Sequence, residues 1–411
     1  MRVRSGGSSS TARAQQQSGE CWGIDPSGSF FVLASGLGNS AAIASRQVCE
    51  NIVKSLLPHR AQIENMAADT RPDSRQMLMS SLCGAMIRSE RTLVEMAEHS
   101  PQLKGMATTC DLLFLANGTV YVGHVGNNRL YLLRGDTGRQ LTIDHTVYEY
   151  LKSQGKDDEQ IAHASYKNKL IRALGMTGGA EIDTLQLDLR KGDRLVLASP
   201  GVWSCFLNAT HLAQLYREMD PQRAADFLVD YALERGSEAD ASVICIEISD
   251  PGVRSSALET DSRIMALEQI CFFRDLSYQE MLQVMPITFE RVVPAGTEII
   301  REGDVGEELY ILVEGSCEVT NSGVTIARLD AGAAFGELSL VDSQPRSATV
   351  RALEVSRMLV IRAADFEKLT LSGALAVKLL WNVTHELCER LRKSSETIRV
   401  QGLKLLKHNI S

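Results

Sequence analysis

The sequence contains no Cys-x-x-Cys pair, no excess of basic residues, and no apolar run of the roughly 18 residues that a membrane helix needs. Its nine cysteines are scattered and odd in number. This is typical of buried thiols in a reducing compartment rather than of a disulfide framework or a zinc site. The net charge of −8 argues against a general binder of nucleic acid or anionic membrane. We therefore predict a cytoplasmic protein that binds neither membrane nor nucleic acid.

The remaining composition is that of a globular protein with two domains. The chain has 411 residues, of which 44% are hydrophobic and 23% charged. Met1–Gln17 is rich in Ser, Gly, Arg and Gln and lacks the apolar core of a signal peptide, so we expect a flexible tail over residues 1–12. The Pro/Gly/Ser stretch Ser249–Ser256 predicts a linker over 249–262. The predicted domains then span residues 13–248 and 263–411.

The stretch Phe335–Val350, FGELSLVDSQPRSATV, has the residues needed to hold a cyclic phosphodiester. The guanidinium of Arg346 can match two phosphate oxygens, and backbone N–H groups from Gly336 to Leu338 add partial positive charge. Gly336 allows close backbone approach, and Glu337 can accept a hydrogen bond from a ribose hydroxyl. Ser347 and Ala348 complete the predicted contacts.

This stretch resembles the phosphate-binding cassette of the cyclic nucleotide-binding domain family. The resemblance implies cyclic AMP, or cyclic GMP, as a ligand, and we favour cyclic AMP. The short β-rich runs between residues 294 and 361 predict a small antiparallel roll, and Ile264–Val284 has apolar residues at helical spacing. The alternative is a surface turn of a β-roll that has lost its ligand.

A long helix is predicted from Ala374 to Lys407, with a seam that alternates three- and four-residue steps. The seam residues are Val377, Leu380, Thr384, Leu387, Leu391, Ser394 and Ile398. We expect a parallel homodimer through it. Glu389–Glu396 resembles the dimer helix of the bacterial catabolite activator proteins, which implies that Ser394 or Ser395 contacts the base; a polar register marker is the alternative. No helix-turn-helix follows this helix in the sequence, so we expect no direct role in transcription.

The first 250 residues alternate strands and helices with Gly-rich turns, which predicts an α+β sandwich. Predicted strands are Phe30–Ala34, Leu112–Ala116, Val120–His124, Leu130–Arg134, Arg194–Ala198 and Val243–Ile248; predicted helices are Ala41–Leu56, Arg75–Glu98, Val147–Gln154 and Pro221–Glu234. The turns resemble those of the bacterial type 2C (PPM) metal-dependent Ser/Thr phosphatases. They are Gly105–Thr109, Val125–Leu133, Leu141–Thr146, Ile171–Gly175, Gly192–Gly201 and Gly236–Ile244. The predicted fold class is α+β: an α-β-β-α phosphatase-like sandwich, then a β-roll (jelly-roll) with a long C-terminal helix.

The departures from that family concern its metal ligands. Its members use a water held between two divalent cations, and such cations need carboxylate ligands. The positions where the family has aspartate are Ser18, Ser35, Asn127, Pro200 and Ala239 in this chain. We therefore expect no catalytic residue and no bound magnesium or manganese. Asp240 could replace one ligand if its turn slips by one residue, and the retained Arg13 is a possible phosphate contact.

These observations together predict a bacterial, cyclic nucleotide-responsive regulatory protein with a pseudophosphatase domain. Its expected partner is a signalling protein such as a kinase, a phosphatase or a phosphoprotein. One alternative is a cyclic nucleotide-gated Ser/Thr phosphatase with an irregular metal site. A second is a constitutive scaffold in which neither pocket is occupied.

Overall fold

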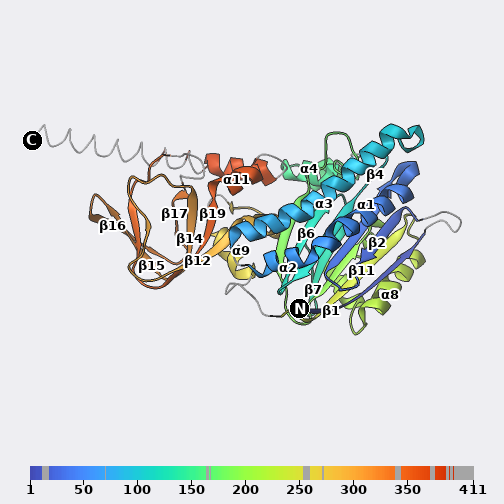
Figure 1. The fold of residues 1–411 in the computed structure, drawn as a ribbon, viewed down its shortest axis with the longest axis horizontal. Coiled ribbons are helices and arrows are strands. Elements are labelled where there is room, and N and C mark those ends of the chain that lie inside the picture. The colour runs from blue at the N-terminus through green and yellow to red at the C-terminus, as the bar shows by residue number, and fades with distance from the viewer. Residues whose placement is uncertain are drawn as a thin grey trace, which may run out of the picture. The chain divides into compact units, whose positions relative to one another are not determined.

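The computed structural model describes residues 1–11, 18–69, 71–162, 166, 168–252, 260–270, 273–337, 344–370, 375–385, 388 and 392. The chain divides into two compact units (Figure 1). The first comprises Met1–Thr260 and Tyr278–Phe289, and the second Asp261–Ser277 and Glu290–Ser411.

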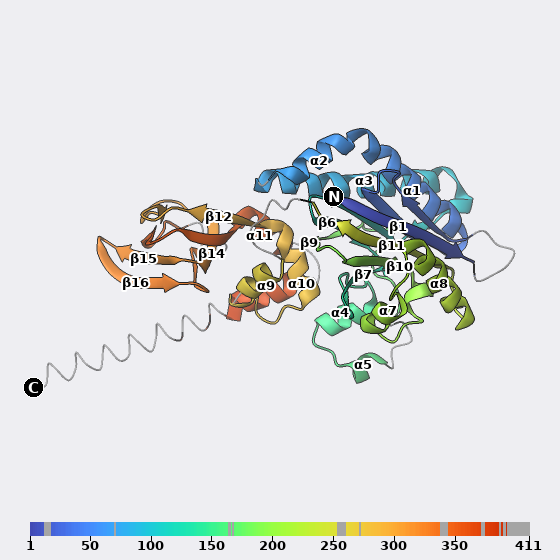
Figure 2. The same cartoon turned by 90° about the horizontal axis from the view of Figure 1, so that it is seen from below.

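The first unit contains two antiparallel sheets between layers of helices (Figure 2). One sheet has the order β1 (Arg2–Ser10), β11 (Ala241–Asp250), β10 (Arg194–Ala198), β7 (Arg129–Arg134) and β8 (Thr137–Gln140). The other has the order β2 (Glu20–Ile24), β3 (Phe30–Leu37), β5 (Cys110–Ala116), β6 (Thr119–Val125) and β9 (Asp183–Asp188), with β4 (Ala107–Thr108) paired to β3. Every residue of β5 is buried, as expected for a strand covered on both faces.

The helices cover the outer face of each sheet. Helices α1 (Ala41–Leu56), α2 (Arg60–Ala68) and α3 (Pro72–His99) share a core with the β3 sheet. Helices α6 (Pro200–Trp203), α7 (Ala209–Leu215) and α8 (Pro221–Glu234) share a core with the β11 sheet. The short helices α4 (Val147–Ser153) and α5 (Asp158–Ala162) follow β8 in the chain. All six strands and all four helices predicted between residues 30 and 248 are present, and α1 and α8 have the predicted bounds.

Helix α8 shows how local sequence sets these bounds. The Asp220 side chain caps the helix by accepting hydrogen bonds from the N–H groups of Gln222 and Arg223. Pro221 occupies the first turn, where its missing N–H costs nothing. Apolar residues at helical spacing then face the core.

The flexible tail predicted for residues 1–12 is wrong for residues 2–10, which form β1. This strand pairs with β11 from Arg2 to Ser10. Its Ser/Gly-rich sequence lacks the alternation that marks a strand, because close packing requires glycines here. A Cβ added at Gly6 would lie 2.4 Å from Gln222 Cα, and one at Gly7 would lie 2.8 Å from the Trp22 ring.

The second unit is the predicted antiparallel roll, made of two facing four-stranded sheets. One has the order β12 (Thr288–Val293), β19 (Ser356–Arg362), β14 (Glu308–Glu314) and β17 (Ala334–Phe335). The other has the order β13 (Glu298–Ile300), β18 (Thr349–Ala352), β15 (Ser316–Asn321) and β16 (Val324–Asp330). Helix α11 (Ala363–Thr370) follows β19, and residues 375–385 are helical.

The single helix predicted over Ile264–Val284 is instead two, α9 (Thr260–Glu268) and α10 (Tyr278–Val284). Asp275 between them has φ 62°, a conformation that cannot continue a helix. Helix α10 belongs to the first unit. The predicted linker 249–262 is shortened at both ends, because β11 reaches Asp250 and α9 begins at Thr260. Residues 253–259 lie outside the described ranges.

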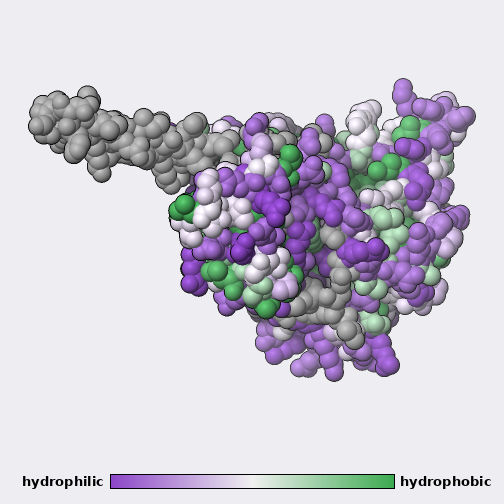
Figure 3. Space-filling view, turned by 60° about the vertical axis from the view of Figure 1, so that its left-hand side comes forward, coloured by the Kyte–Doolittle hydropathy of each residue, from purple (hydrophilic) through white to green (hydrophobic). Residues whose placement is uncertain are grey.

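None of the helices within the described ranges has both the length and the apolar character that a bilayer span requires. On the face shown in Figure 3, hydrophilic residues predominate and hydrophobic ones occur in small separate groups.

Candidate functional site

Two polar side chains from other segments of the first unit, Glu20 and Asn128, lie against the hydroxyl of Ser35. Ser35 on β3 is the register partner of Glu20 on β2. Its Oγ lies 3.2 Å from Glu20 Oε1 and donates to Asn128 Oδ1 over 2.9 Å. Ser18 Oγ accepts a hydrogen bond from the Glu20 N–H over 3.1 Å. Ser35 and Ser18, two positions predicted to have lost an aspartate, therefore both contact Glu20, Ser35 at its carboxyl group and Ser18 at its backbone N–H.

The two turns that contain Pro200 and Ala239 lie against each other. Gly201 is packed so closely on the second turn that an added Cβ would lie 2.1 Å from the carbonyl oxygen of Asp240. Asp240 Oδ2 in turn accepts a hydrogen bond from the Gly19 N–H over 2.6 Å. Backbone contacts thus bring Pro200 and Ala239 to the start of β2.

Glu20 was missed in the sequence because it is not one of the positions where the related family has a ligand. As a residue it is half-buried, but its Oε2 atom is shielded from solvent and has no hydrogen-bond partner among the described residues. Burial raises the Glu20 pKa to about 8, against the opposing effect of the Ser242, Ser199 and Ser35 hydroxyls. The carboxyl group is therefore mostly protonated at neutral pH.

In the turn that follows Gly126, Asn127 makes a hydrogen bond through its backbone, whereas the side chain of Asn128 is the one that contacts Ser35. The carbonyl oxygen of Asn127 accepts a hydrogen bond from Trp203 Nε1 over 2.9 Å. The guanidinium of Arg129 stacks on the Trp203 ring at 3.5 Å and makes a bidentate ion pair with Asp144. This arginine holds the turn in place, which gives it a structural role.

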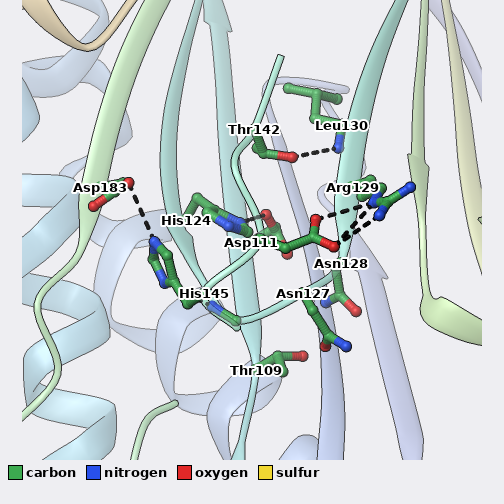
Figure 4. Close-up of polar contacts among 12 residues, drawn as sticks. Thr109, Asp111, His124, Asn127, Asn128, Arg129, Leu130, Thr142, His145 and Asp183 are labelled. Atoms are coloured by element: carbon green, nitrogen blue, oxygen red, sulfur yellow. Dashed lines mark hydrogen bonds and ion pairs between the residues drawn. The ribbon is translucent and has the colours of Figure 1, made fainter. Parts of the chain in front are cut away.

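Behind this turn, Asp111 and His124 form a buried ion pair (Figure 4). His124 Nδ1 lies 2.6 Å from Asp111 Oδ1, and Nε2 lies 2.9 Å from the carbonyl oxygen of Ile143. Burial opposes ionisation of the ring, but the Asp111 carboxylate outweighs it and raises the His124 pKa to about 9. Both ring nitrogens then carry protons and donate hydrogen bonds, one to Asp111 and one to Ile143. The need to pair with the charged His124 explains why Asp111 occurs in the otherwise apolar strand β5.

His145 is the neutral neighbour of His124, with ring centroids 4.8 Å apart. Its Nδ1 accepts a hydrogen bond from the Gly126 N–H, so its proton lies on Nε2, 3.2 Å from Asp183 Oδ2. Burial lowers the His145 pKa. Burial alone would raise the Asp183 pKa, but His145 and Arg172 bring it to about 2.

Helix α10 is joined to this network by a side-chain hydrogen bond. Gln283 Nε2 donates to Asp183 Oδ2 over 2.5 Å. In the 3-10 turn that follows, the carbonyl oxygen of Met285 accepts from Gln186 on β9 over 3.2 Å. A continuous path of contacts therefore runs from Gln283 through Asp183 and His145 to Gly126, the first residue of the turn that carries Asn128.

In the second unit, Arg346 is held by its backbone and by its side chain. Its N–H donates to Asp304, and its carbonyl oxygen accepts from Gly303, each over 2.8 Å. The guanidinium donates to the carbonyl oxygens of Gly336 and Glu308, at 3.0 and 2.8 Å. Gly336 has φ 76°, and a Cβ added there would lie 2.9 Å from the carbonyl oxygen of Glu308, so this position needs a glycine.

Comparison with known proteins identifies the two units. Residues 290–372 match the family model of the cyclic nucleotide-binding domain. A cyclic nucleotide-gated potassium channel of Rhizobium etli is 32% identical over 123 residues, covering 30% of this chain and 31% of the channel.

The serine/threonine phosphatase stp of Listeria innocua is 33% identical over 158 residues, or 38% of this chain; the aligned part spans 63% of that relative. The structure of PppA from Pseudomonas aeruginosa aligns with 60% of this chain and 98% of its own at a TM-score of 0.51 and 19% identity, which shows the fold.

The chain joins a PPM-type Ser/Thr phosphatase domain to a C-terminal cyclic nucleotide-binding domain. The predicted fold class is thereby confirmed. In the cyclic nucleotide-binding domain, Glu337 and Ala348 are half-buried and Ser347 is exposed. Leu338, Ser394 and Ser395 lie outside the described residues, as does Arg13 of the PPM-type domain.

The donor set of the PPM-type domain does not fit a pair of divalent cations. Within the described ranges, no group of three or more His, Cys, Asp or Glu side chains could hold a metal ion. Among the described residues, two carboxyl groups lie at the site; Glu20 is mostly protonated at neutral pH, and Asp240 is bonded to a backbone N–H. Ser35 and Asn128 supply neutral oxygens, whereas hard cations need several charged oxygen ligands.

Proposed function

We propose that this chain is a cytoplasmic, cyclic nucleotide-responsive regulatory protein whose PPM-type domain acts by binding another protein. The observation that carries the proposal is the set of contacts around Ser35. A protonated Glu20 can donate to Ser35 Oγ, and Ser35 donates to Asn128 Oδ1. This chain of neutral hydrogen bonds stabilises the site with no need for a cation.

The ligand side of the proposal rests on Arg346. Its planar guanidinium now donates to two backbone carbonyls, and a cyclic phosphodiester could take over these donors through charge-assisted bonds. Glu337 would accept from the ribose, and Ser347 and Ala348 would flank the phosphate. We propose cyclic AMP as the ligand, with cyclic GMP as the alternative.

Helix α10 offers a route by which the ligand could act on the PPM-type domain. It ends at Val284, shortly before residues 290–372 that match the cyclic nucleotide-binding family, and its Gln283 is bonded to Asp183. Ligand binding that favours one position of α10 would change the contacts of Asp183 and His145, and through them the Gly126 turn. Such a shift requires that the ligand binds the two arrangements with different affinity. The regulated surface would then bind a kinase, a phosphatase or a phosphoprotein.

A second candidate function is a cyclic nucleotide-gated Ser/Thr phosphatase with an irregular metal site. It is favoured by the Asp240 and Glu20 carboxyl groups at the site and by the relatives named as Ser/Thr phosphatases. A single cation held by these two groups would be its minimum requirement.

A phosphatase assay separates the two candidates. Full-length protein would be incubated with a phosphothreonine peptide and manganese or magnesium, with and without cyclic AMP, beside the Listeria enzyme as a positive control. We expect no turnover above buffer under any condition. Metal-dependent turnover that is lost in both Glu20→Gln and Asp240→Asn would establish the second candidate instead.

Titration calorimetry with cyclic AMP and cyclic GMP tests the ligand separately. If neither nucleotide binds, the chain is the constitutive scaffold rather than a receptor. Affinity capture with and without cyclic AMP then tests the partner. The proposal requires at least one signalling protein whose recovery changes with the nucleotide.

A further inference from the structure

We propose that Cys21 and Cys49 are a peroxide-sensitive thiol pair that closes to a reversible disulfide. Cys21 lies on the edge strand β2, directly after Glu20, and Cys49 lies on α1. Cys49 Sγ donates to the carbonyl oxygen of Cys21 over 3.2 Å. The proposal does not depend on the function proposed above.

The position of the two side chains permits a direct bond. Cys49 belongs to the core cluster that α1 forms with the β3 sheet, and Cys21 is packed against the same cluster. A disulfide needs Cα atoms about 4.4–6.8 Å apart. With Cys49 Sγ in contact with the Cys21 backbone, rotation of two side chains rather than a change of fold would bring the sulfurs together.

The two thiols differ in the way that an attacking and a resolving thiol must differ. Cys21 is half-buried, whereas Cys49 is 4% exposed. The Cys49 thiol lowers the Cys21 pKa by hydrogen bonding; burial opposes this, and the Arg46 charge adds to the lowering. The same contact, together with burial, raises the Cys49 pKa. Cys21 is therefore the thiol that a small oxidant can reach and that forms a thiolate more easily.

The reaction with hydrogen peroxide balances in two steps. The Cys21 thiolate attacks one peroxide oxygen, the S–O bond forms, the O–O bond breaks and hydroxide leaves, which gives a sulfenic acid. The Cys49 sulfur then attacks the Cys21 sulfur, the S–S bond forms, and the oxygen leaves as water after taking up the Cys49 proton. The two thiols lose two electrons, and the peroxide gains them. A dithiol reductant reverses the change by thiol–disulfide exchange.

The disulfide would tie the edge strand that carries Glu20 to helix α1. In a reducing compartment such a bond forms only transiently, which is typical of redox sensing rather than of structural stabilisation. Closing the loop between residues 21 and 49 should raise the melting temperature of the PPM-type domain by roughly 5 °C.

The test uses the full-length protein, reduced, freed of reductant and treated with graded hydrogen peroxide. Non-reducing peptide mapping should recover the Cys21 and Cys49 peptides linked to each other. Cys205, which is also half-buried but bonded to the carbonyl oxygens of Gly201 and Ala232, is the matched internal control. We expect Cys21 to oxidise about tenfold faster than Cys205, because reactivity follows thiolate fraction and access.

Single variants make the outcome decisive. In Cys49→Ser, Cys21 should stop at the sulfenic acid and be trapped by dimedone; in Cys21→Ser, Cys49 should stay reduced. Equal oxidation rates at Cys21 and Cys205, a cross-link of Cys21 to another cysteine, or oxidation of Cys49 in Cys21→Ser would each overturn the proposal. A variant that fails to fold is detected by its melting curve, and the wild-type cross-link and rates then decide alone.

Discussion

Gln283 Nε2 and Asp183 Oδ2 are 2.5 Å apart, and this bond joins helix α10 to the buried histidine network of the PPM-type domain. Asp183 also bonds Arg172 and faces His145, whose other ring nitrogen accepts the Gly126 N–H. A helix that precedes the cyclic nucleotide-binding family match is thus connected by side chains to the Gly126 turn. The connection makes the coupling between ligand and output testable one residue at a time.

The Gln283→Ala variant should loosen α10 without unfolding the PPM-type domain. Loss of a hydrogen bond to a charged partner should cost about 1.5–3 kcal/mol of local stability. Hydrogen exchange followed by mass spectrometry should show faster exchange in α10 and β9, while α8 stays unchanged. Gln279→Ala on the same helix is the control. Equal exchange in both variants would mean that the bond does not hold the helix.

The Glu20→Gln variant should remove a pH dependence of stability. The folded-state pKa of Glu20 is raised from 4.5 to about 8, so the folded protein holds this proton more tightly than the unfolded chain does. The stabilisation is full below about pH 4.5 and is lost as the pH rises through 8. Urea unfolding should therefore show that the wild type's free energy of unfolding falls across this pH window. The fall should be on the order of a few kcal/mol larger than in Glu20→Gln. The variant Glu98→Gln, at an exposed position of α3, is the control, and parallel curves for all three proteins would contradict the prediction.

Ser35→Asp should destabilise the domain in the absence of metal and make it responsive to manganese. The new carboxylate would lie against Glu20, whose Oε1 is 3.2 Å from Ser35 Oγ, so two acidic groups would compete for one proton. We expect a loss of about 1–3 kcal/mol at neutral pH without metal. Restoring aspartate also at Asn127, Pro200 and Ala239 should strengthen the response. Melting curves with and without manganese measure this response, and Ser35→Asn is the uncharged control. If manganese changes the melting temperature of neither the single nor the multiple aspartate variant, the prediction that these positions can hold a metal is wrong.

Arg346→Ala should weaken cyclic AMP binding by roughly 2–4 kcal/mol, the range for losing a charge-assisted contact to a phosphate. Calorimetry measures the affinity. Arg351→Ala is the control, because Arg351 is an exposed strand residue paired with Glu298. Unchanged affinity in Arg346→Ala would mean that Arg346 does not bind the phosphate. A tenfold preference for cyclic GMP in a competition titration would make cyclic GMP the ligand instead of cyclic AMP.

The chain should form a parallel dimer through the helix predicted from residue 374 to 407. In its described part, Val377, Leu380 and Trp381 are 51%, 51% and 72% exposed, which leaves an apolar stripe facing solvent. If a nucleotide bridges the two helices near Ser394, ligand binding and association strengthen each other by the same free energy. Light scattering at several concentrations, with and without cyclic AMP, measures this. Leu380→Glu should shift the protein to monomer, with Lys378→Glu as the control; a monomer throughout would mean that the stripe has another role.

Periodic and local patterns were enough to predict most of the elements. Helices α1 and α8 have the predicted bounds because helical spacing, and in α8 also the Asp220 cap and Pro221, are local properties of the chain. The cassette around Arg346 was recognisable because the residues that would hold a phosphate lie within one short stretch. The family match to residues 290–372 confirms that this part is a cyclic nucleotide-binding domain.

Tertiary structure decided what depends on partners distant in sequence. The Ser/Gly-rich strand β1 exists because β11 pairs with it and because Gln222 and Trp22 leave room only for glycine. Nothing in the sequence marks Glu20, and only its burial in the fold raises its pKa, against the opposing effect of the Ser242, Ser199 and Ser35 hydroxyls. Local sequence therefore determined the elements and the ligand cassette. The packing of distant segments decided which carboxyl group lies at the PPM-type site and whether that group is charged, because burial and proximity are properties of the folded chain alone.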